Sequence, residues 1–168
     1  TPNFLSPTHL RCTVEVLKRH FRFSDADNRD ISIELDPRTV SPQDMAELAL
    51  AGFNRASLGV QDFDPAVQAA VNRIQGVEQT RAVVDACRNH GFRSINLDLI
   101  YGLPYQTVMG FSRTLERVLA MDPERLSIYN YAHLPGLFKP QRRIAEADLP
   151  SADTKLQILA LAIKKLTE

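Results

Sequence analysis

The sequence predicts an α/β fold, namely part of a (β/α) barrel with about four parallel strands and flanking helices. Helix and strand patterns alternate from end to end of the 168 residues, and strands separated by helices pair in parallel through right-handed crossovers. A doubly wound sheet has the same order, but no strand is followed by a glycine-rich dinucleotide fingerprint, which favours the barrel. The first complete element is a helix. We therefore expect the first barrel strands to be missing and residues 1–168 to form a single internal fragment of the barrel domain.

The first four elements follow from capping residues and from apolar periodicity. Ser6 can cap a helix over residues 7–20, which opens with proline and repeats apolar residues at helical spacing. Alternating apolar and polar residues over 31–35 predict a strand. A capping-box-like start and a closing glycine indicate a helix over residues 41–52. Residues 55–60 then read as the second strand.

The remaining elements alternate in the same way. They are a short helix from Asp64–Pro65, a helix over 77–90, a strand over 94–99, a helix over 107–119, a strand over 126–131 and a helix that begins near Ser151. Gly91 suits the C-terminal end of the long helix, and Thr107 can cap the next one. The last helix places four apolar residues on one face: Leu156, Leu159, Ile163 and Leu166. An irregular segment, rich in arginine, lysine and proline, precedes it.

Composition excludes several classes of partner. Basic and acidic residues number 20 each, so the formal net charge is zero, which argues against a nucleic-acid partner. There is no apolar run of membrane-spanning length and no basic-then-apolar signal segment, so we expect a cytoplasmic protein without a membrane partner. Cys12 and Cys87 share no motif spacing and are predicted to be buried or half-buried free thiols on helices, with a single disulfide as the alternative.

Polar residues follow the predicted strands, where function gathers in a parallel barrel. Glu34, Gln61, Asp98 and His133 lie at the carboxyl ends of the four strands, and Arg73 follows the short helix after the second strand. Carboxylates accept hydrogen bonds from hydroxyl and ammonium groups, and arginine forks onto a carboxylate. The set therefore suits a polar, zwitterionic ligand that carries ribose hydroxyls.

Each of these residues also has a structural interpretation. Glu34 or Asp98 could cap a helix or pair with a cation, and Gln61 could cap the backbone groups that follow it. Arg73 alone is typical of a surface ion pair, and His133 of a structural hydrogen bond. Spacing alone leaves these alternatives open.

Other chemistries find little support in the sequence. There is no Walker loop, no His-Glu-x-x-His, no Cys-x-x-Cys and no Gly-x-Ser-x-Gly motif. Nothing resembles a nucleophile with its base, so no catalytic and no metal-binding residue is predicted in this chain. Arg142–Arg143 is expected to be a solvated pair, with contact to an acidic substrate as the less favoured alternative.

Six motifs in order along the chain are specific enough to indicate a family. They are IELDP (33–37), GFNR (52–55), GVQDF (59–63), NR (72–73), NLDLIYGLP (96–104) and NYAHLP (130–135). Together they resemble the oxygen-independent coproporphyrinogen III oxidases, which are radical S-adenosylmethionine enzymes of heme biosynthesis. The motif at 96–104 is shared with the radical-SAM-like heme chaperones, whereas the last motif is more similar to the oxidases.

The resemblance implies an activity for the full-length parent. In the family, a partial (β/α) barrel opens on a [4Fe-4S] cluster held by three cysteines of a Cys-x3-Cys-x2-Cys loop after the first strand. Cleavage of S-adenosylmethionine yields a 5′-deoxyadenosyl radical, which removes hydrogen from propionates of coproporphyrinogen III. Loss of CO2 and an electron gives vinyl groups, and two such events give protoporphyrinogen IX. Partners of the parent are thus coproporphyrinogen III and an electron donor.

The resemblance also implies cofactor-binding positions. Glu34 and Ala132 match residues that bind the cluster-bound S-adenosylmethionine, and Gln61, Arg73 and Asp98 match contacts to a second S-adenosylmethionine. Thr1 matches the end of a Gly-Gly-Gly-Thr-Pro loop that touches both.

The chain departs from the family pattern in one important respect. It has no cluster-binding cysteine loop, so we expect it to be inactive by itself and to self-associate through the unpaired edge of the strand at 31–35. The alternatives to an oxidase fragment are part of a heme chaperone and a binding module that never had a cluster loop.

Overall fold

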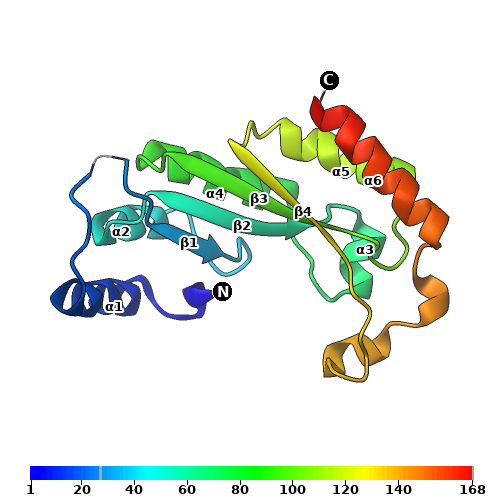
Figure 1. Cartoon of the computed structure of the whole chain (residues 1–168), viewed down its shortest axis with the longest axis horizontal. Coiled ribbons are helices and arrows are strands. Elements are labelled where there is room, and N and C mark those ends of the chain that lie inside the picture. Colours follow the sequence, from blue (N-terminus) through cyan, green and yellow to red (C-terminus); the bar gives the residue numbers. More distant parts are fainter. Residues whose placement is uncertain (27, 168) are drawn as a thin grey trace. The chain divides into compact units, whose positions relative to one another are not determined.

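The computed structural model describes residues 1–26 and 28–167 and confirms the predicted order of elements (Figure 1). The helices are α1 (Pro7–His20), α2 (Asp44–Ala51), α3 (Pro65–Ala70), α4 (Val77–Asn89), α5 (Val108–Leu119) and α6 (Ala152–Thr167). The strands are β1 (Ser32–Leu35), β2 (Arg55–Gln61), β3 (Ser94–Tyr101) and β4 (Arg125–Asn130). Three short 3-10 turns are η1 (Pro2–Phe4), η2 (Lys139–Arg143) and η3 (Glu146–Asp148).

The four parallel strands form one sheet in the order β1-β2-β3-β4, as predicted for part of a barrel (Figure 1). The register between the first two strands pairs Ser32 with Arg55 and Leu35 with Leu58. Sequential strands are neighbours and helices connect them, which is the connectivity of a (β/α) barrel wall. Strands β1 and β4 lie at the two edges of this sheet.

The chain divides into two compact units. The first consists of residues 1–60, 78–97 and 123–126, and the second of residues 61–77, 98–122 and 127–168. Strands β2, β3 and β4 begin in the first unit and end in the second, whereas β1 lies wholly in the first. The carboxyl ends of β2, β3 and β4 therefore belong to the same unit.

Each unit has its own apolar core. Fully buried side chains of the first unit include Leu35, Met45, Leu48, Leu58, Val84, Cys87, Ile95 and Leu97. Those of the second unit include Leu99, Phe111, Leu115, Val118 and Ile158. Burial of such side chains is the main favourable contribution to folding. Helices α1 and α2 pack together in the first unit, and α5 and α6 in the second.

The predicted helix caps are mostly confirmed. The Ser6 hydroxyl accepts a hydrogen bond from the His9 amide at 3.3 Å, and the Thr107 hydroxyl accepts from the Gly110 amide at 3.0 Å. The start of α2 was predicted too early: the helix begins at Asp44. The Asp44 carboxylate there accepts from both the amide and the hydroxyl of Ser41, and residues 42–43 form a turn.

The apolar face of α6 read from the sequence is not the face that packs. Ile158 and Ala162 are buried, whereas Leu156 and Ile163 are 65% and 55% exposed. The helix is turned this way because α5 contacts it, and the Lys165 ammonium donates a hydrogen bond to the Glu116 carboxylate of α5. That partner holds the pKa of Glu116 below its usual range.

The two cysteines both lie on helices, but the predicted burial of Cys12 is wrong. Cys12 is exposed on α1, and Cys87 is buried on α4 with its Sγ 3.4 Å from the Met45 Sδ. Burial raises the pKa of Cys87 to about 12. The two thiols should therefore differ strongly in reactivity, because the thiolate is the reacting species.

We expect an aromatic disulfide reagent to modify one thiol of the native protein rapidly, namely Cys12, and Cys87 only after unfolding. The released chromophore, measured before and after addition of guanidinium, reports each thiol. A Cys12→Ser variant serves as the control and should show no fast phase. Two fast equivalents in the native wild type would contradict the burial of Cys87.

None of the helices in residues 1–26 and 28–167 has the length and hydrophobicity of a membrane-spanning segment.

Candidate functional site

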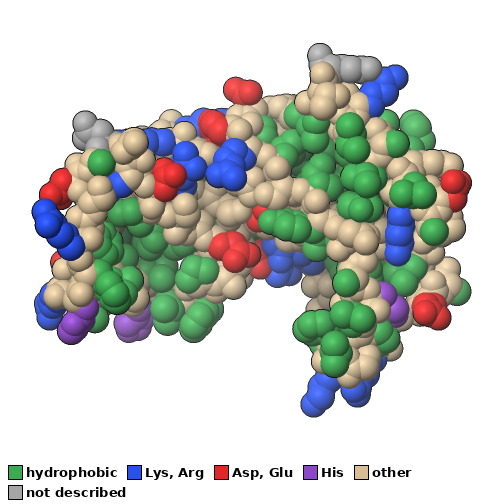
Figure 2. Space-filling model, in the orientation of Figure 1, with side chains coloured by type: hydrophobic (Ala, Val, Ile, Leu, Met, Phe, Trp, Pro, Cys, Tyr) green, Lys and Arg blue, Asp and Glu red, His purple; other side chains and the backbone are tan. Residues whose placement is uncertain are grey.

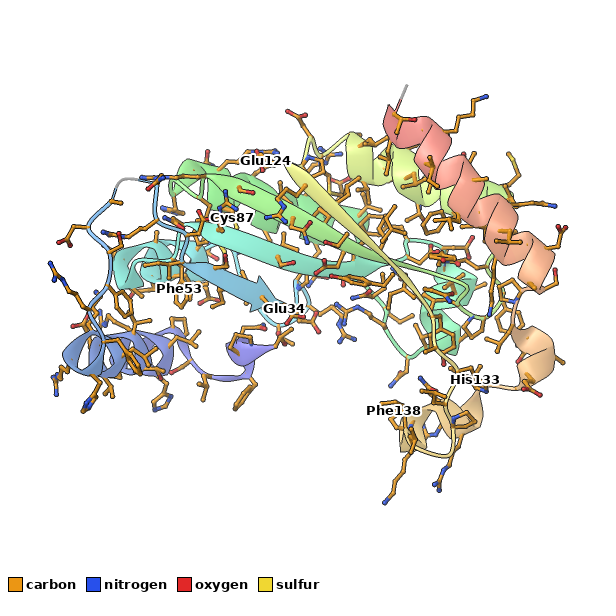
Figure 3. All side chains as sticks on the ribbon, in the orientation of Figure 1. Glu34, Phe53, Cys87, Glu124, His133 and Phe138 are labelled. Atoms are coloured by element: carbon orange, nitrogen blue, oxygen red, sulfur yellow. The ribbon has the colours of Figure 1, made fainter. Side chains whose placement is uncertain are left out.

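The carboxyl end of β1 carries Glu34 beside the N-terminal turn. Glu34 is exposed because β1 alternates, with Ile33 and Leu35 in the core, and Figure 3 shows it near the tip of that strand. The Asn3 side chain accepts from the Asp36 amide at 3.1 Å and donates to the Asp36 carbonyl at 3.4 Å. These bonds hold η1 against the end of β1, so Thr1 and Glu34 come from segments that are joined at this point.

A charged pair stiffens the same turn. The Asp36 carboxylate accepts from the Arg38 amide at 3.0 Å and from the Arg38 guanidinium at 2.6 Å. This pairing raises the pKa of Arg38 above its ordinary value. Asp36 therefore has a structural role as the partner of Arg38. Glu34 is the carboxylate at this strand end that is exposed and available to a ligand.

The carboxyl end of β2 is bent at Gln61. Its backbone φ is +67°, in the left-handed region that is uncommon for residues other than glycine. Such strained residues persist only where their surroundings fix them, and they cluster at functional sites. The next residue supplies that fixation, because Asp62 is only 1% exposed and fully hydrogen-bonded.

Three donors converge on the buried Asp62 carboxylate. Its Oδ1 accepts from the Thr114 hydroxyl of α5 at 2.7 Å and from the Asp64 amide at 2.7 Å, and its Oδ2 accepts from the Gln106 amide group at 2.6 Å. Burial nevertheless raises the pKa of Asp62, because these hydrogen bonds offset desolvation only in part. The carboxylate joins β2 to α5 and to the loop after β3.

Gln106 extends the network to the end of β3. Its Nε2 also donates to the Ile100 carbonyl at 2.9 Å, and its Oε1 accepts from the Gly102 amide at 2.6 Å. Asp98 lies two residues before Ile100 on the same strand and is half-buried. The pair Asp62–Gln106 therefore fixes the relative positions of the strand ends that carry Gln61 and Asp98.

The turn that carries Arg73 is tied to the same network. The Arg73 amide donates to the Gln68 carbonyl at 2.8 Å. The Gln68 side chain donates to the Asp62 carbonyl at 2.9 Å and to the Gln75 carbonyl at 2.8 Å. Two buried glutamines thus close the turn around Arg73.

The loop after β4 carries Ala132 and is closed by Gln141. The Gln141 amide group donates to the Ala132 carbonyl at 3.0 Å and accepts from the Leu134 amide, while the Arg142 Nε donates to the Pro135 carbonyl at 3.1 Å. His133, labelled in Figure 3, lies 3.4 Å through its Nδ1 from the Tyr131 hydroxyl. This contact agrees with the structural interpretation of His133.

We expect Gln141→Ala to loosen this loop, because the Leu134 amide loses its acceptor. Hydrogen exchange at Leu134, followed by NMR, should accelerate about tenfold or more, with a stability loss of about 1 kcal/mol. Gln157→Ala removes a surface bond to Asp153 on α6 and is the matched control. An unchanged exchange rate at Leu134 would show that the glutamine does not hold the loop.

Four of the six predicted cofactor-binding residues belong to one compact unit: Gln61, Arg73, Asp98 and Ala132. Thr1 and Glu34 belong to the other. The supporting residues Asp62, Gln106 and Gln141 were not predicted, because their partners lie 44 residues away for the first pair and nine for the last. No local pattern signals such pairs.

The residues present suit S-adenosylmethionine but not an iron–sulfur cluster. Carboxylate, amide and guanidinium groups match ribose hydroxyls and an amino-acid moiety. Clusters of this kind take several cysteine thiolates, whereas the sequence has two cysteines, one of them buried in a core. Among the described residues, no group of three or more His, Cys, Asp or Glu side chains could hold a metal ion.

Comparisons with known proteins give consistent relatives. The model of the radical SAM superfamily matches residues 7–118. The chain is 53% identical over 166 residues to an oxygen-independent coproporphyrinogen III oxidase of Pseudomonas aeruginosa and 47% identical over 168 residues to that of Escherichia coli. It covers 36% of each of these proteins, so it spans about a third of the length of its curated relatives.

Solved structures agree with the sequence relatives. The coproporphyrinogen III oxidase of Escherichia coli, described as a radical SAM enzyme, superposes with a TM-score of 0.95 at 46% identity, over 99% of this chain and 38% of that one. An archaeal Elp3 of Methanocaldococcus infernus superposes with a TM-score of 0.67 at 17% identity, over 79% of this chain and 32% of that one. The second likeness concerns the fold alone.

Proposed function

This chain belongs to the radical SAM superfamily, and we propose that it is the S-adenosylmethionine-binding part of an oxygen-independent coproporphyrinogen III oxidase. The whole enzyme oxidatively decarboxylates two propionates of coproporphyrinogen III to the vinyl groups of protoporphyrinogen IX. The observation that carries this proposal is 53% identity to such an oxidase along almost the entire chain. The polar side chains at the carboxyl ends of the strands support it further, because they suit the ribose and amino-acid groups of S-adenosylmethionine.

Each polar residue has a role in this proposal. The Glu34 and Asp98 carboxylates accept hydrogen bonds from ribose hydroxyls or from an ammonium group, and the Gln61 amide does the same. The Arg73 guanidinium forks onto a ligand carboxylate. Bound S-adenosylmethionine supplies the group that abstracts hydrogen in radical SAM enzymes.

We assign these residues to two S-adenosylmethionine molecules. Thr1, Glu34 and Ala132 contact the first, and Gln61, Arg73 and Asp98 contact the second. The segments that carry the last three are joined by the Asp62–Gln106 bond and by the Gln68 bond to the Asp62 carbonyl, which supports their grouping around one ligand. The whole enzyme further requires a [4Fe-4S] cluster on cysteines from outside this chain, and an electron donor.

The test uses the polypeptide that continues this chain to the length of its relatives, reconstituted anaerobically with iron and sulfide. S-adenosylmethionine, a reductant and coproporphyrinogen III are added, and protoporphyrinogen IX is measured. Formation of this product supports the oxidase. Cleavage of S-adenosylmethionine without product, together with stoichiometric heme uptake, would replace the proposal by a heme chaperone.

The edge of β1 supports a proposal about assembly of the isolated chain. Within the described residues β1 pairs with β2 and is the outermost strand, and an open parallel edge is a template for another strand. We infer that two copies associate through it. Sedimentation velocity over a hundredfold range of concentration should show dimer formation; a monomer throughout, with slow exchange of the amides of residues 31–35, would refute it.

A further inference from the structure

A hollow of about 410 Å³ lies in the second unit, between the end of α3 and the turn η2. Its walls are Ala70, Val71, Asn72, Lys139, Pro140 and Arg143. Neither the strand ends nor the hydrogen-bond networks of the proposed S-adenosylmethionine site use these side chains. The hollow is therefore separate from the proposed S-adenosylmethionine site.

The charge of this hollow is positive and uncompensated. Lys139 and Arg143 both line it, and no carboxylate does. Neither cation has an ion pair or a side-chain hydrogen bond among the residues that the structure describes. Their neighbour Arg142 differs, because its Nε is bonded to the Pro135 carbonyl. An anion in the hollow would meet two cationic groups and the amide of Asn72.

The same segment exposes apolar side chains next to these cations. Leu137 is 76% exposed, Phe138 54% and Leu134 44%. Figure 2 shows hydrophobic side chains gathered on the lobe that contains η2, with Lys and Arg side chains at its lower end, and Figure 3 places Phe138 on that lobe. An exposed apolar patch bordered by charge marks a binding surface.

The position of the hollow relates it to the proposed reaction. Asn72, with a φ of +53°, precedes Arg73 directly, so one wall of the hollow continues into the turn that carries a proposed S-adenosylmethionine contact. A ligand seated here would lie beside the turn that carries this proposed cofactor contact.

We propose that this hollow binds a propionate carboxylate of a tetracarboxylate tetrapyrrole, while the apolar ring lies against Leu137 and Phe138. The proposal rests on the proposed function and names the substrate contacts within it. Lys139 and Arg143 donate to the carboxylate, and Arg143 does so in bidentate fashion. An apolar ring bearing carboxylates complements a surface that is both apolar and cationic, whereas a small free anion would leave the apolar part uncovered.

The test measures binding of coproporphyrin III, the stable oxidised form of the tetrapyrrole, to the 168-residue chain by fluorescence. The double variant Lys139→Gln/Arg143→Gln should weaken binding about tenfold or more, since the charge-assisted hydrogen bonds from both cationic side chains are lost. Arg19→Gln/Arg22→Gln removes the same charge from exposed positions outside this unit and should change the affinity less than about twofold. Salt should weaken wild-type binding more than that of the first variant.

Three results would overturn the proposal: no porphyrin binding by the wild type, equal binding by the Lys139/Arg143 variant, or an equal loss in the Arg19/Arg22 control. The proposed function can fail separately. Suppose that the full-length protein forms product and that the Lys139/Arg143 variant leaves KM for coproporphyrinogen III unchanged. The proposed oxidase function is then supported, and the proposed substrate contacts in the hollow are refuted. If no product forms but porphyrin binding depends on the two cations, the hollow is a porphyrin-binding site and the proposed oxidase activity is refuted.

Discussion

Replacing Asp62 with alanine is expected to lower the free energy of unfolding by about 3 kcal/mol, the largest effect on stability among the polar residues. The substitution removes the acceptor of the buried Thr114 hydroxyl, one of the two acceptors of the buried Gln106 amide group, and the acceptor of the half-buried Asp64 amide. Each buried donor without a partner costs desolvation free energy, and the small cavity adds to it. Urea unfolding followed by circular dichroism measures the change.

The matched control for this substitution is Asp25→Ala. Asp25 is exposed, and its side chain makes no hydrogen bond or ion pair within residues 1–26 and 28–167, so its removal should change stability by less than about 0.5 kcal/mol. If Asp62→Ala were as stable as this control, the network could not be what holds the strand ends together. Hydrogen exchange at Gly102, whose amide is bonded to Gln106, gives a second readout.

The pH dependence of stability tests the same carboxylate in a different way. Burial raises the pKa of Asp62 in the folded protein, so the folded state binds this proton more tightly than the unfolded state does. The stabilisation is complete below the unfolded pKa of about 4 and is lost as pH rises through the higher folded pKa. The wild type should therefore lose more stability than Asp62→Asn between pH 4 and pH 7.

The sequence predicted the helices and strands well because the contacts that begin and end them involve residues close together in the chain. Ser6 and Thr107 accept from amides three residues ahead, and Gly52 ends α2 with a φ of +105°. Such contacts depend on residues that are adjacent in sequence, so the sequence alone identifies them. The order of helices and strands then determines the parallel sheet.

Tertiary contacts account for what the sequence did not predict. The side of α6 that packs is set by α5, so Ile158 is buried while Leu156 is exposed. Cys12 lies on an amphipathic helix, but on its exposed side. The bond between Gln106 and Asp62 joins residues 44 positions apart. The buried face of a helix and the partners of a buried polar side chain depend on which elements pack together. Apolar periodicity in the sequence does not predict that packing.

The candidate site shows the same division. The residues expected to touch a ligand lie at strand ends, where the fold class alone directs attention: Glu34, Gln61 and Asp98. The fold class does not predict which residues hold these side chains in place. Asn3 and Gln141 bond to backbone groups of other segments. The Asp62 carboxylate bonds to the side chains of Gln106 and Thr114, 44 and 52 positions away. Only the assembled structure therefore identifies these three as positioning residues.

Removing either Arg73 or Asp98 from the full-length enzyme is expected to reduce turnover severely and to leave the fold intact. Both residues are proposed to contact S-adenosylmethionine through charge-assisted hydrogen bonds. The loss of such an interaction costs about 2–3 kcal/mol, or about 30- to 150-fold in kcat/KM. Anaerobic assays of Arg73→Ala and Asp98→Ala would measure this effect, with Arg22→Ala and Asp25→Ala as controls at exposed positions.

The conservative variant Arg73→Lys separates ligand binding from a structural role. Lysine keeps the charge but cannot fork onto a carboxylate, so its activity should lie between those of the wild type and Arg73→Ala, with the deficit in KM for S-adenosylmethionine. A purely structural role would instead lower the midpoint of urea unfolding in step with activity. Because the Arg73 backbone is held by Gln68, the turn itself should survive both substitutions. Wild-type turnover by both alanine variants would refute the assignment of these side chains to the cofactor.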